Sequence, residues 1–172
     1  MGHALDIHIA RLTPDHPALV TIAHWHFAQW GHLRINDSEA AALERLRAAC
    51  TPATVPSAYV ALCGETPVGT ARLIAYDMPD MPRRTPWLAA VIVAPEYRRR
   101  GIASQLVRHA EQTAFEAGYV ALHLYTPDQQ GLYTRLGWRP LEDIDYRGQR
   151  VTVMRRLAPR LEAQRQARAS RG

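Results

Sequence analysis

The stretch from Val91 to Ser104 contains the residues whose types and spacing most clearly suggest a chemical role. It reads as a buried apolar strand, a basic turn that contains Gly101, and the first turn of a helix. A helix that begins directly after such a turn points several backbone N–H groups at one spot, and such a spot binds phosphate. Consecutive arginines add positive charge around it. The sequence therefore predicts that this turn binds a phosphorylated ligand.

A second motif follows about thirty residues later, where residues 132–138 read Leu-Tyr-Thr-Arg-Leu-Gly-Trp. The turn itself, residues 98–103, reads Arg-Arg-Arg-Gly-Ile-Ala and matches the pattern Arg/Gln-x-x-Gly-x-Gly/Ala. With both motifs at this distance, the chain resembles the GNAT superfamily of N-acetyltransferases. The resemblance covers residues 57–157 well and the first 50 residues in outline.

The resemblance implies acetyl-CoA as the cosubstrate, with its pyrophosphate held by backbone N–H groups from Arg99 to Ser104. Gly101 would permit close approach of the backbone because it carries no side chain. The pantetheine arm would bind like an added strand, which requires the strand at 87–93 to diverge from the one at 119–125. The implied cofactor-binding residues are Val91, Ile92, Val93, Arg98, Arg99, Arg100, Gly101, Ile102, Ala103 and Ser104.

Tyr133 is the catalytic residue that the resemblance implies. When an amine attacks acetyl-CoA, the thiolate of CoA must leave, and a phenol with a pKa near 10 can donate a proton or a hydrogen bond to it. Direct transfer in a ternary complex is expected, because no cysteine stands in the motif positions. No metal is expected, since Cys50 and Cys63 lack the spacing of metal ligands.

The general base and the acceptor site are defined less closely. The attacking amine must lose a proton, and the resemblance places the acceptor near the first helix. The histidines considered as bases are His24, His26, His32 and His123. The acidic residues that could attract a cationic amine, or simply belong to a solvated loop, are Glu142, Asp143 and Asp145. Aromatic candidates for the wall of the site are Trp25, Trp30, Tyr76 and Trp87, although ordinary core packing is the more common role for each of them taken singly.

The elements that must position these groups follow from the periodicity of apolar residues. Helices are expected near residues 13–30, 36–49, 101–117 and 126–136, and an irregular proline-rich loop is expected at 76–86. Strands are expected near residues 5–12, 59–62, 68–75, 87–93, 119–125, 138–141 and 151–157. The order β-α-α-β-β-β-α-β-α-β-β predicts one α/β (α+β) GNAT-like domain over residues 1–158. Its mixed central sheet should have six or seven strands, flanked by about four helices.

Polar stretches predict where three helices begin. Residues 13–15 offer a start for the first helix, with Pro17 in its first turn, and residues 36–38 offer a cap for the second. Thr126 is an expected N-cap for the short helix that carries Tyr133, with Gln129 completing a capping box.

The charge distribution indicates which classes of partner the protein can bind. The 172 residues carry a formal net charge of +5, all of the cationic side chains being arginine. Much of the excess lies in the basic tail, residues 159–172, which reads as a solvated helix or a disordered segment. A folded body that is nearly neutral argues against nucleic acid as the partner. A nucleic-acid-binding module that uses the turn at Arg98–Arg100 and the tail remains an alternative function, as does a CoA-binding regulator without turnover.

The remaining expectations concern location and assembly. No apolar run is long enough to span a membrane, and the N-terminus lacks the pattern of a secretory signal. Two free cysteines suit a reducing compartment, so a cytoplasmic location is expected. The resemblance implies a possible homodimer. The acceptor is left open between a small amine and the N-terminus or a side chain of a peptide or protein.

Overall fold

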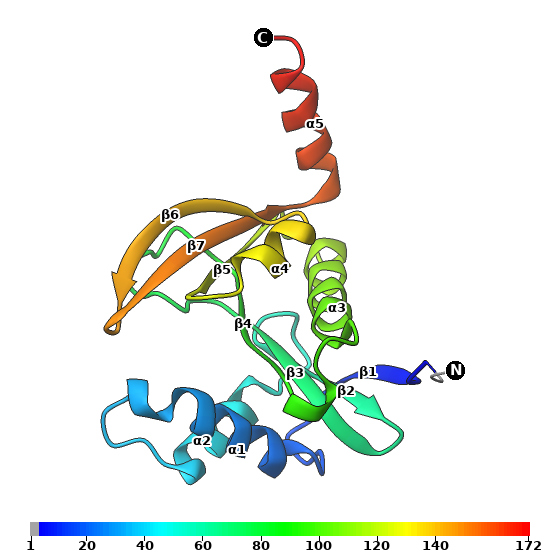
Figure 1. The fold of residues 1–172 in the computed structure, drawn as a ribbon, viewed down its shortest axis with the longest axis vertical. Helices are drawn as coiled ribbons and strands as arrows, with labels where there is room; N and C mark the ends of the chain where they lie inside the picture. Colours follow the sequence, from blue (N-terminus) through cyan, green and yellow to red (C-terminus); the bar gives the residue numbers. More distant parts are fainter. Residues whose placement is uncertain (1–3) are drawn as a thin grey trace. The chain divides into compact units, whose positions relative to one another are not determined.

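The computed structural model describes residues 4–172. Within this range it contains a seven-stranded mixed sheet in the order β1-β2-β3-β4-β5-β7-β6 and five α-helices (Figure 1). The predicted α/β fold is confirmed. The chain forms two compact units, each made of two segments. The first unit combines the described residues up to Ile74 with Leu88–Ala110, and the second combines Ala75–Trp87 with Glu111–Gly172. Among the described residues, no helix combines the length and the apolar character needed to cross a bilayer.

The strands and helices lie close to the expected positions. The strands are β1 (Ile7–Arg11), β2 (Ser57–Cys63), β3 (Thr66–Ile74), β4 (Trp87–Val93), β5 (Ala121–Thr126), β6 (Arg139–Tyr146) and β7 (Gln149–Leu157). The helices are α1 (Leu19–Trp30), α2 (Glu39–Ala49), α3 (Ile102–Glu116), α4 (Gln130–Arg135) and α5 (Pro159–Ala169). Short 3-10 turns occupy Gly31–Leu33 and Pro95–Tyr97.

In the first unit, β1 and β2 pair antiparallel, and so do β2 and β3. Helices α1 and α2 contact each other and bury Leu19, Ile22 and Leu46 in a cluster with Ala58 and Val60 of β2. The expected cap of α2 is confirmed, because the Ser38 hydroxyl accepts a hydrogen bond of 3.0 Å from the backbone N–H of Ala41. The apolar faces of α1 and α2 thus close one side of this part of the sheet.

Helix α1 begins later than expected. Residues 13–15 form a turn in which the His16 N–H donates to the Thr13 carbonyl over 3.1 Å, and the helix starts at Leu19 without a side-chain cap. The prolines explain the delay. The residue before a proline is disfavoured in the helical region, so Pro17 keeps His16 out of a helix.

Helix α3 carries the apolar stripe expected of it. Its side chains Ile102, Leu106, Val107, Ala110 and Ala114 are all fully buried. Strand β4 departs from the expectation of burial along its whole length. Trp87, Leu88 and Ala89 are buried, whereas Ala90, Val91, Ile92 and Val93 are only half-buried.

In the second unit, β5 pairs antiparallel with β7, and β7 with β6. Parallel pairing of β4 with β5 joins Trp87 to His123, and the His123 N–H donates to the Pro86 carbonyl over 3.0 Å. Strand β6 is longer than expected and takes in the whole acidic cluster, which therefore does not form a loop. A register shift at Pro140 lets the hairpin continue past this residue, which has no N–H to give.

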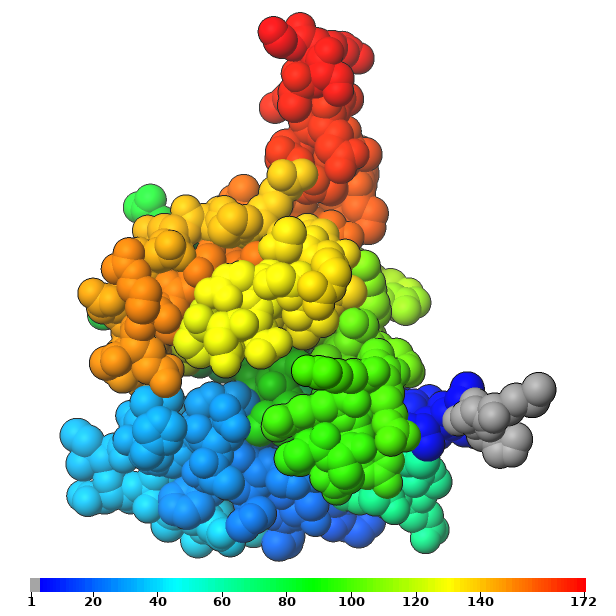
Figure 2. Space-filling model, viewed as in Figure 1, coloured from blue at the N-terminus to red at the C-terminus, as the bar shows by residue number. Residues whose placement is uncertain are grey.

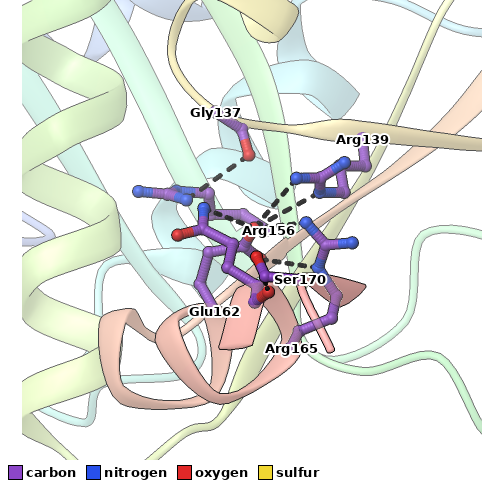
Figure 3. Close-up of polar contacts among 7 residues, drawn as sticks. Gly137, Arg139, Arg156, Glu162, Arg165 and Ser170 are labelled. Carbon is purple, nitrogen blue, oxygen red and sulfur yellow. Dashed lines mark hydrogen bonds and ion pairs between the residues drawn. The ribbon is translucent and has the colours of Figure 1, made fainter. Parts of the chain in front are cut away.

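The basic tail is helical rather than disordered. Figure 2 shows α5 projecting from the rest of its unit. Figure 3 shows what anchors it: Glu162 accepts hydrogen bonds from Arg165 (2.8 Å) within the helix and from Arg139 (3.0 Å) of β6. These bonds, that of Arg165 first, hold the pKa of Glu162 at about 2. Glu162 therefore stays ionised, and paired with both arginines, across the physiological pH range.

Candidate functional site

The turn between β4 and α3 has a distinctive backbone. The Ala94 N–H donates to the Val68 carbonyl of β3 over 2.9 Å and so ties down the end of β4. Arg99 and Gly101 then adopt left-handed conformations with φ of 60° and 77°. Left-handed residues interrupt the regular alternation of the chain, and turns of this type direct successive N–H groups to the same side.

Gly101 is also where α3 begins, because its carbonyl accepts the first helical hydrogen bond from the Gln105 N–H over 3.1 Å. The N–H groups of Ile102, Ala103 and Ser104 lie in the first turn, where a helix has no internal partner for them. A Cβ added to Gly101 would meet no atom within 4 Å, so the space beside it is open. The positive φ is what requires glycine here, and the open side leaves room for a ligand.

The three arginines of the turn differ in what they contact. Arg98 donates from Nε to the Val93 carbonyl over 3.1 Å, which covers the end of β4. Arg100 places its guanidinium 5.8 Å from the centre of the Tyr97 ring. Arg99 is exposed. The positive charge expected around the turn is present, but two of its three side chains also hold the turn together.

One edge of β4 packs tightly on β3. A Cβ added to Gly69 of β3 would lie 3.0 Å from the Ile92 carbonyl oxygen and 3.0 Å from a methyl of Leu106. Backbone groups of alternate residues in a strand point to opposite edges. The groups of Val91 and Val93 are therefore those that face away from β3.

Ala90 is a feature that sequence reasoning missed. It lies in the middle of β4 with a φ of 54°, in the left-handed region that alanine rarely adopts. Such conformations cost about 1–3 kcal/mol and cluster at functional sites. Alanine itself signals no turn, so nothing in the residue type could have revealed this kink.

Tyr133 lies in α4 and is nearly buried, with 7% of its surface exposed. Burial, and then the nearby charge of Asp128, raise its pKa to about 12. Its ring and the Trp138 indole pack in a T-shaped arrangement, with the two ring centres 6.0 Å apart. The Thr126 hydroxyl accepts a hydrogen bond of 3.0 Å from the Gln129 N–H, but this bond lies before the helix, whose N-cap residue is Gln129 and which has no side-chain cap.

The expected capping box, with Thr126 as the N-cap and Gln129 in the first turn, is wrong. Gln130, rather than Gln129, reaches back, and its side-chain amide donates to the Pro127 carbonyl over 3.2 Å and to the Thr152 hydroxyl over 3.1 Å. Helix α4 begins at Gln130 rather than at Pro127, and this first residue is bonded to β7.

Two of the candidate bases are too weakly basic for the role. His26 is 6% exposed, and burial, followed by the charges of Arg72 and Arg45, lowers its pKa to about 3. Burial also lowers the pKa of His123 to about 4. An imidazole with such a pKa takes a proton poorly from an alkylammonium group. Burial, which the residue type does not reveal, is therefore what excludes these two histidines as the general base.

The other two histidines lie on the surface of the first unit. His24 is exposed and its Nδ1 lies 2.7 Å from Glu39 Oε1. His32, in the 3-10 turn after α1, is exposed as well. Among residues 4–172, no group of three histidine, cysteine or acidic side chains is arranged to hold a metal ion.

The acidic side chains of β6 are paired with other residues of the same unit. Glu142 pairs with Arg84 at 2.6 Å, Asp143 accepts from the Thr152 hydroxyl at 2.6 Å, and Asp145 pairs with Arg150 at 3.5 Å. These contacts reduce the negative charge that the cluster offers to an incoming amine.

The aromatic residues considered for the wall of the acceptor site separate into core and surface. Trp87 is fully buried and packs against His123 and Tyr125, with ring centres 5.7 and 6.3 Å away. It is therefore a core residue, the alternative that the sequence left open for each of these aromatic side chains. Trp25 and Trp30 are half-buried on α1, and Tyr76 is 59% exposed.

Comparison with known proteins identifies relatives of this arrangement. A family model described as "Acetyltransferase (GNAT) family" matches residues 19–138. The crystal structure of aminoglycoside 6'-N-acetyltransferase complexed with coenzyme A has a TM-score of 0.70 at 16% identity, covering 87% of this chain and 96% of that one. Aminoglycoside 6'-acetyltransferase type Ii has a TM-score of 0.68 at 19% identity, with the same coverage of 87% and 96%. An acetyltransferase from Thermus thermophilus has a TM-score of 0.64 at 18% identity, covering 91% and 100%. No curated protein matches the sequence significantly.

Proposed function

Because the chain belongs to the acetyltransferase (GNAT) family, we propose that it transfers the acetyl group of acetyl-CoA to a primary amine by direct attack in a ternary complex. The observation that carries this proposal is the turn before α3, where Arg99 and Gly101 are left-handed and the helix begins. A diphosphate needs several N–H donors and a backbone that it can approach closely. This turn supplies both, and the positive end of the helix dipole adds to them.

In this proposal the residues from Arg98 to Ser104 bind the pyrophosphate of acetyl-CoA. The amides of the pantetheine arm bind to the backbone of Val91 and Val93, which faces away from β3. The Arg98 side chain already bonds the Val93 carbonyl, which leaves the Val93 N–H for the ligand. The kink at Ala90 would set the direction of the strand just before these contacts.

Tyr133 is proposed to assist the leaving thiolate. The amine nitrogen attacks the thioester carbonyl, a C–N bond forms, the C–S bond breaks, and the electron pair leaves with sulfur. A phenol beside that sulfur stabilises the thiolate by donating a hydrogen bond. The high pKa of Tyr133 supports this role, because the hydroxyl stays protonated at any pH where the enzyme would work.

The proton that the amine loses is proposed to pass to water. His26 and His123 are too weakly basic to receive it, for the reason given above. An amine that reacts as its free base needs no strong protein base. The rate should then rise with pH until the free base of the acceptor predominates.

The acceptor class is tested with a panel of amines and labelled acetyl-CoA. The panel includes small alkylamines, peptides with a free N-terminus, lysine peptides and aminoglycosides, since two of the similar structures are aminoglycoside acetyltransferases. We expect one class to be acetylated with release of one CoA per acetyl group. Folded protein that transfers no label to any class and does not bind acetyl-CoA would contradict the proposal.

A further inference from the structure

Helix α4 is too short to hold its own position. It has six residues, and an isolated helix of that length is not stable in water. Its place therefore depends on contacts at its two ends. The first end is bonded to β7 through Gln130 and Thr152. The second end leads through Leu136 into Gly137 and Trp138.

Trp138 connects this second end to Tyr133. It is 1% exposed, its backbone N–H donates to the Tyr133 carbonyl over 2.9 Å, and its indole meets the Tyr133 ring at an interplanar angle of 66°. The positive φ of 92° at Gly137 allows the chain to turn back in this way. Rotation of the indole would remove the surface on which the Tyr133 ring packs.

A buried carboxylate fixes that indole. Glu111 of α3 is 5% exposed, and its Oε1 accepts a hydrogen bond of 2.8 Å from the indole N–H of Trp138. Arg156 of β7 lies with its Nε 3.7 Å from the same oxygen and donates to the Gly137 carbonyl over 3.4 Å. Figure 3 shows Arg156 beside Gly137. Burying a carboxylate is unfavourable unless charge and hydrogen bonds compensate it, so an apolar side chain would fill this space more simply.

We propose that Glu111 is a positioning residue for the acetyl transfer, because it holds the Trp138 indole and, through it, the phenol of Tyr133. This inference rests on the proposed role of Tyr133. The competing explanation is that Glu111 and Arg156 form an ion pair that supports the fold alone. The two explanations differ in what happens locally at Tyr133 when the carboxylate is removed.

The variants are chosen so that the protein can fold. Glu111→Gln keeps an oxygen that can accept from Trp138. The double variant Glu111→Leu with Arg156→Met removes the acceptor and the unpaired cation together, and replacing a buried ion pair by apolar residues is often neutral for stability. Glu116→Gln is the matched control, since Glu116 lies on the same helix but is exposed and accepts a hydrogen bond from Gln112 within it.

The first test needs no acceptor and uses nitration of tyrosines by tetranitromethane, with each site read by peptide mass spectrometry. In the wild type, Tyr133 should resist nitration while the exposed Tyr76 reacts. The double variant should nitrate Tyr133 at a rate approaching that of Tyr76, and Glu111→Gln should remain protected. Tyr59, fully buried in the other unit, reports general unfolding. Protection of Tyr133 that persists in the double variant, or that is lost in step with that of Tyr59, would refute the proposal.

The second test measures kcat in the presence and in the absence of the Tyr133 hydroxyl. The double variant should lose about tenfold in kcat, because small misplacement of a reacting group costs one to two orders of magnitude. In a Tyr133→Phe background the same double variant should cause almost no further loss. Equal losses in both backgrounds would make Glu111 structural. Full turnover by Tyr133→Phe alone would instead remove the proposed role of the tyrosine, whatever the nitration shows.

Discussion

Replacing Tyr133 by phenylalanine is the substitution that bears most directly on the chemistry. The pKa of Tyr133 is about 12, whereas an ordinary thiol has a pKa of about 8.5. Complete transfer of the phenolic proton to the CoA thiolate would therefore be unfavourable by about 5 kcal/mol. A hydrogen bond to the thiolate avoids that cost. Such a bond to a charged group contributes about 1.5–3 kcal/mol, so Tyr133→Phe should lower kcat by about 10- to 150-fold.

The assay is release of the CoA thiol at saturating acceptor, followed with a chromogenic thiol reagent. The KM for acetyl-CoA should change little, because the hydroxyl acts on the leaving group. Tyr119→Phe is the matched control, since Tyr119 is exposed and lies after α3. If kcat stays within a factor of about two, or if affinity and kcat fall together, the tyrosine has no role in departure of the thiolate.

The pH profile provides a second reading of the same residue. Burial keeps the Tyr133 hydroxyl protonated until its pKa of about 12, so the wild type should show no alkaline loss of kcat from this group below about pH 11. An alkaline limb near pH 10 that disappears in Tyr133→Phe would contradict the buried, protonated state.

Three further predictions follow from the backbone and from burial. Gly69→Ala should lower stability by about 1–3 kcal/mol in urea unfolding, because the new methyl would lie 3.0 Å from the Ile92 carbonyl oxygen; unchanged stability would show that β3 and β4 can separate. Gly101→Ala and Gly118→Ala place alanine at comparable positive φ values of 77° and 98° in open space. Only Gly101→Ala should weaken binding of acetyl-CoA in a fluorescence titration. Equal effects of the two substitutions would show that backbone strain, and not loss of a ligand contact at the turn, causes the weakening. His26 stays neutral in the folded state down to a pKa of about 3, whereas the unfolded imidazole takes up a proton near its ordinary value of 6.5. The contribution of neutral His26 to the free energy of unfolding is therefore complete above pH 6.5 and is lost as the pH falls, by about 3 kcal/mol between pH 7 and 4. His26→Gln should flatten the dependence of unfolding free energy on pH in that range. An unaltered slope would disprove that His26 is buried as the neutral form.

The elements around the turn could be predicted because local signals agree there. The stripe from Ile102 to Ala114 has helical spacing, Gly118 ends the helix with a positive φ of 98°, and the run from Trp87 to Val93 is wholly apolar. Each of these is a property of neighbouring residues in the sequence. The cap at Ser38 could be predicted for the same reason.

The rest depends on contacts between distant segments. The acidic cluster looked like a loop because its residues are polar, yet pairing with β7 extends β6 through it to Tyr146. The local sequence also does not show that His26 is buried, or that Arg72 of β3 and Arg45 of α2 lie near it. Glu111 belongs to the same group. A glutamate on an amphipathic helix is expected to be solvated, and its indole partner lies 27 positions further along the chain.

The central claim is that the turn from Arg98 to Ser104 grips a diphosphate, and titration calorimetry with two ligands tests it most directly. CoA carries the diphosphate together with the adenosine 3′-phosphate, and pantetheine carries neither. We predict that the full chain binds CoA with measurable heat and binds pantetheine far more weakly, the difference shrinking as salt is raised. Equal affinity for the two ligands, or no binding of CoA by folded protein, would contradict the account.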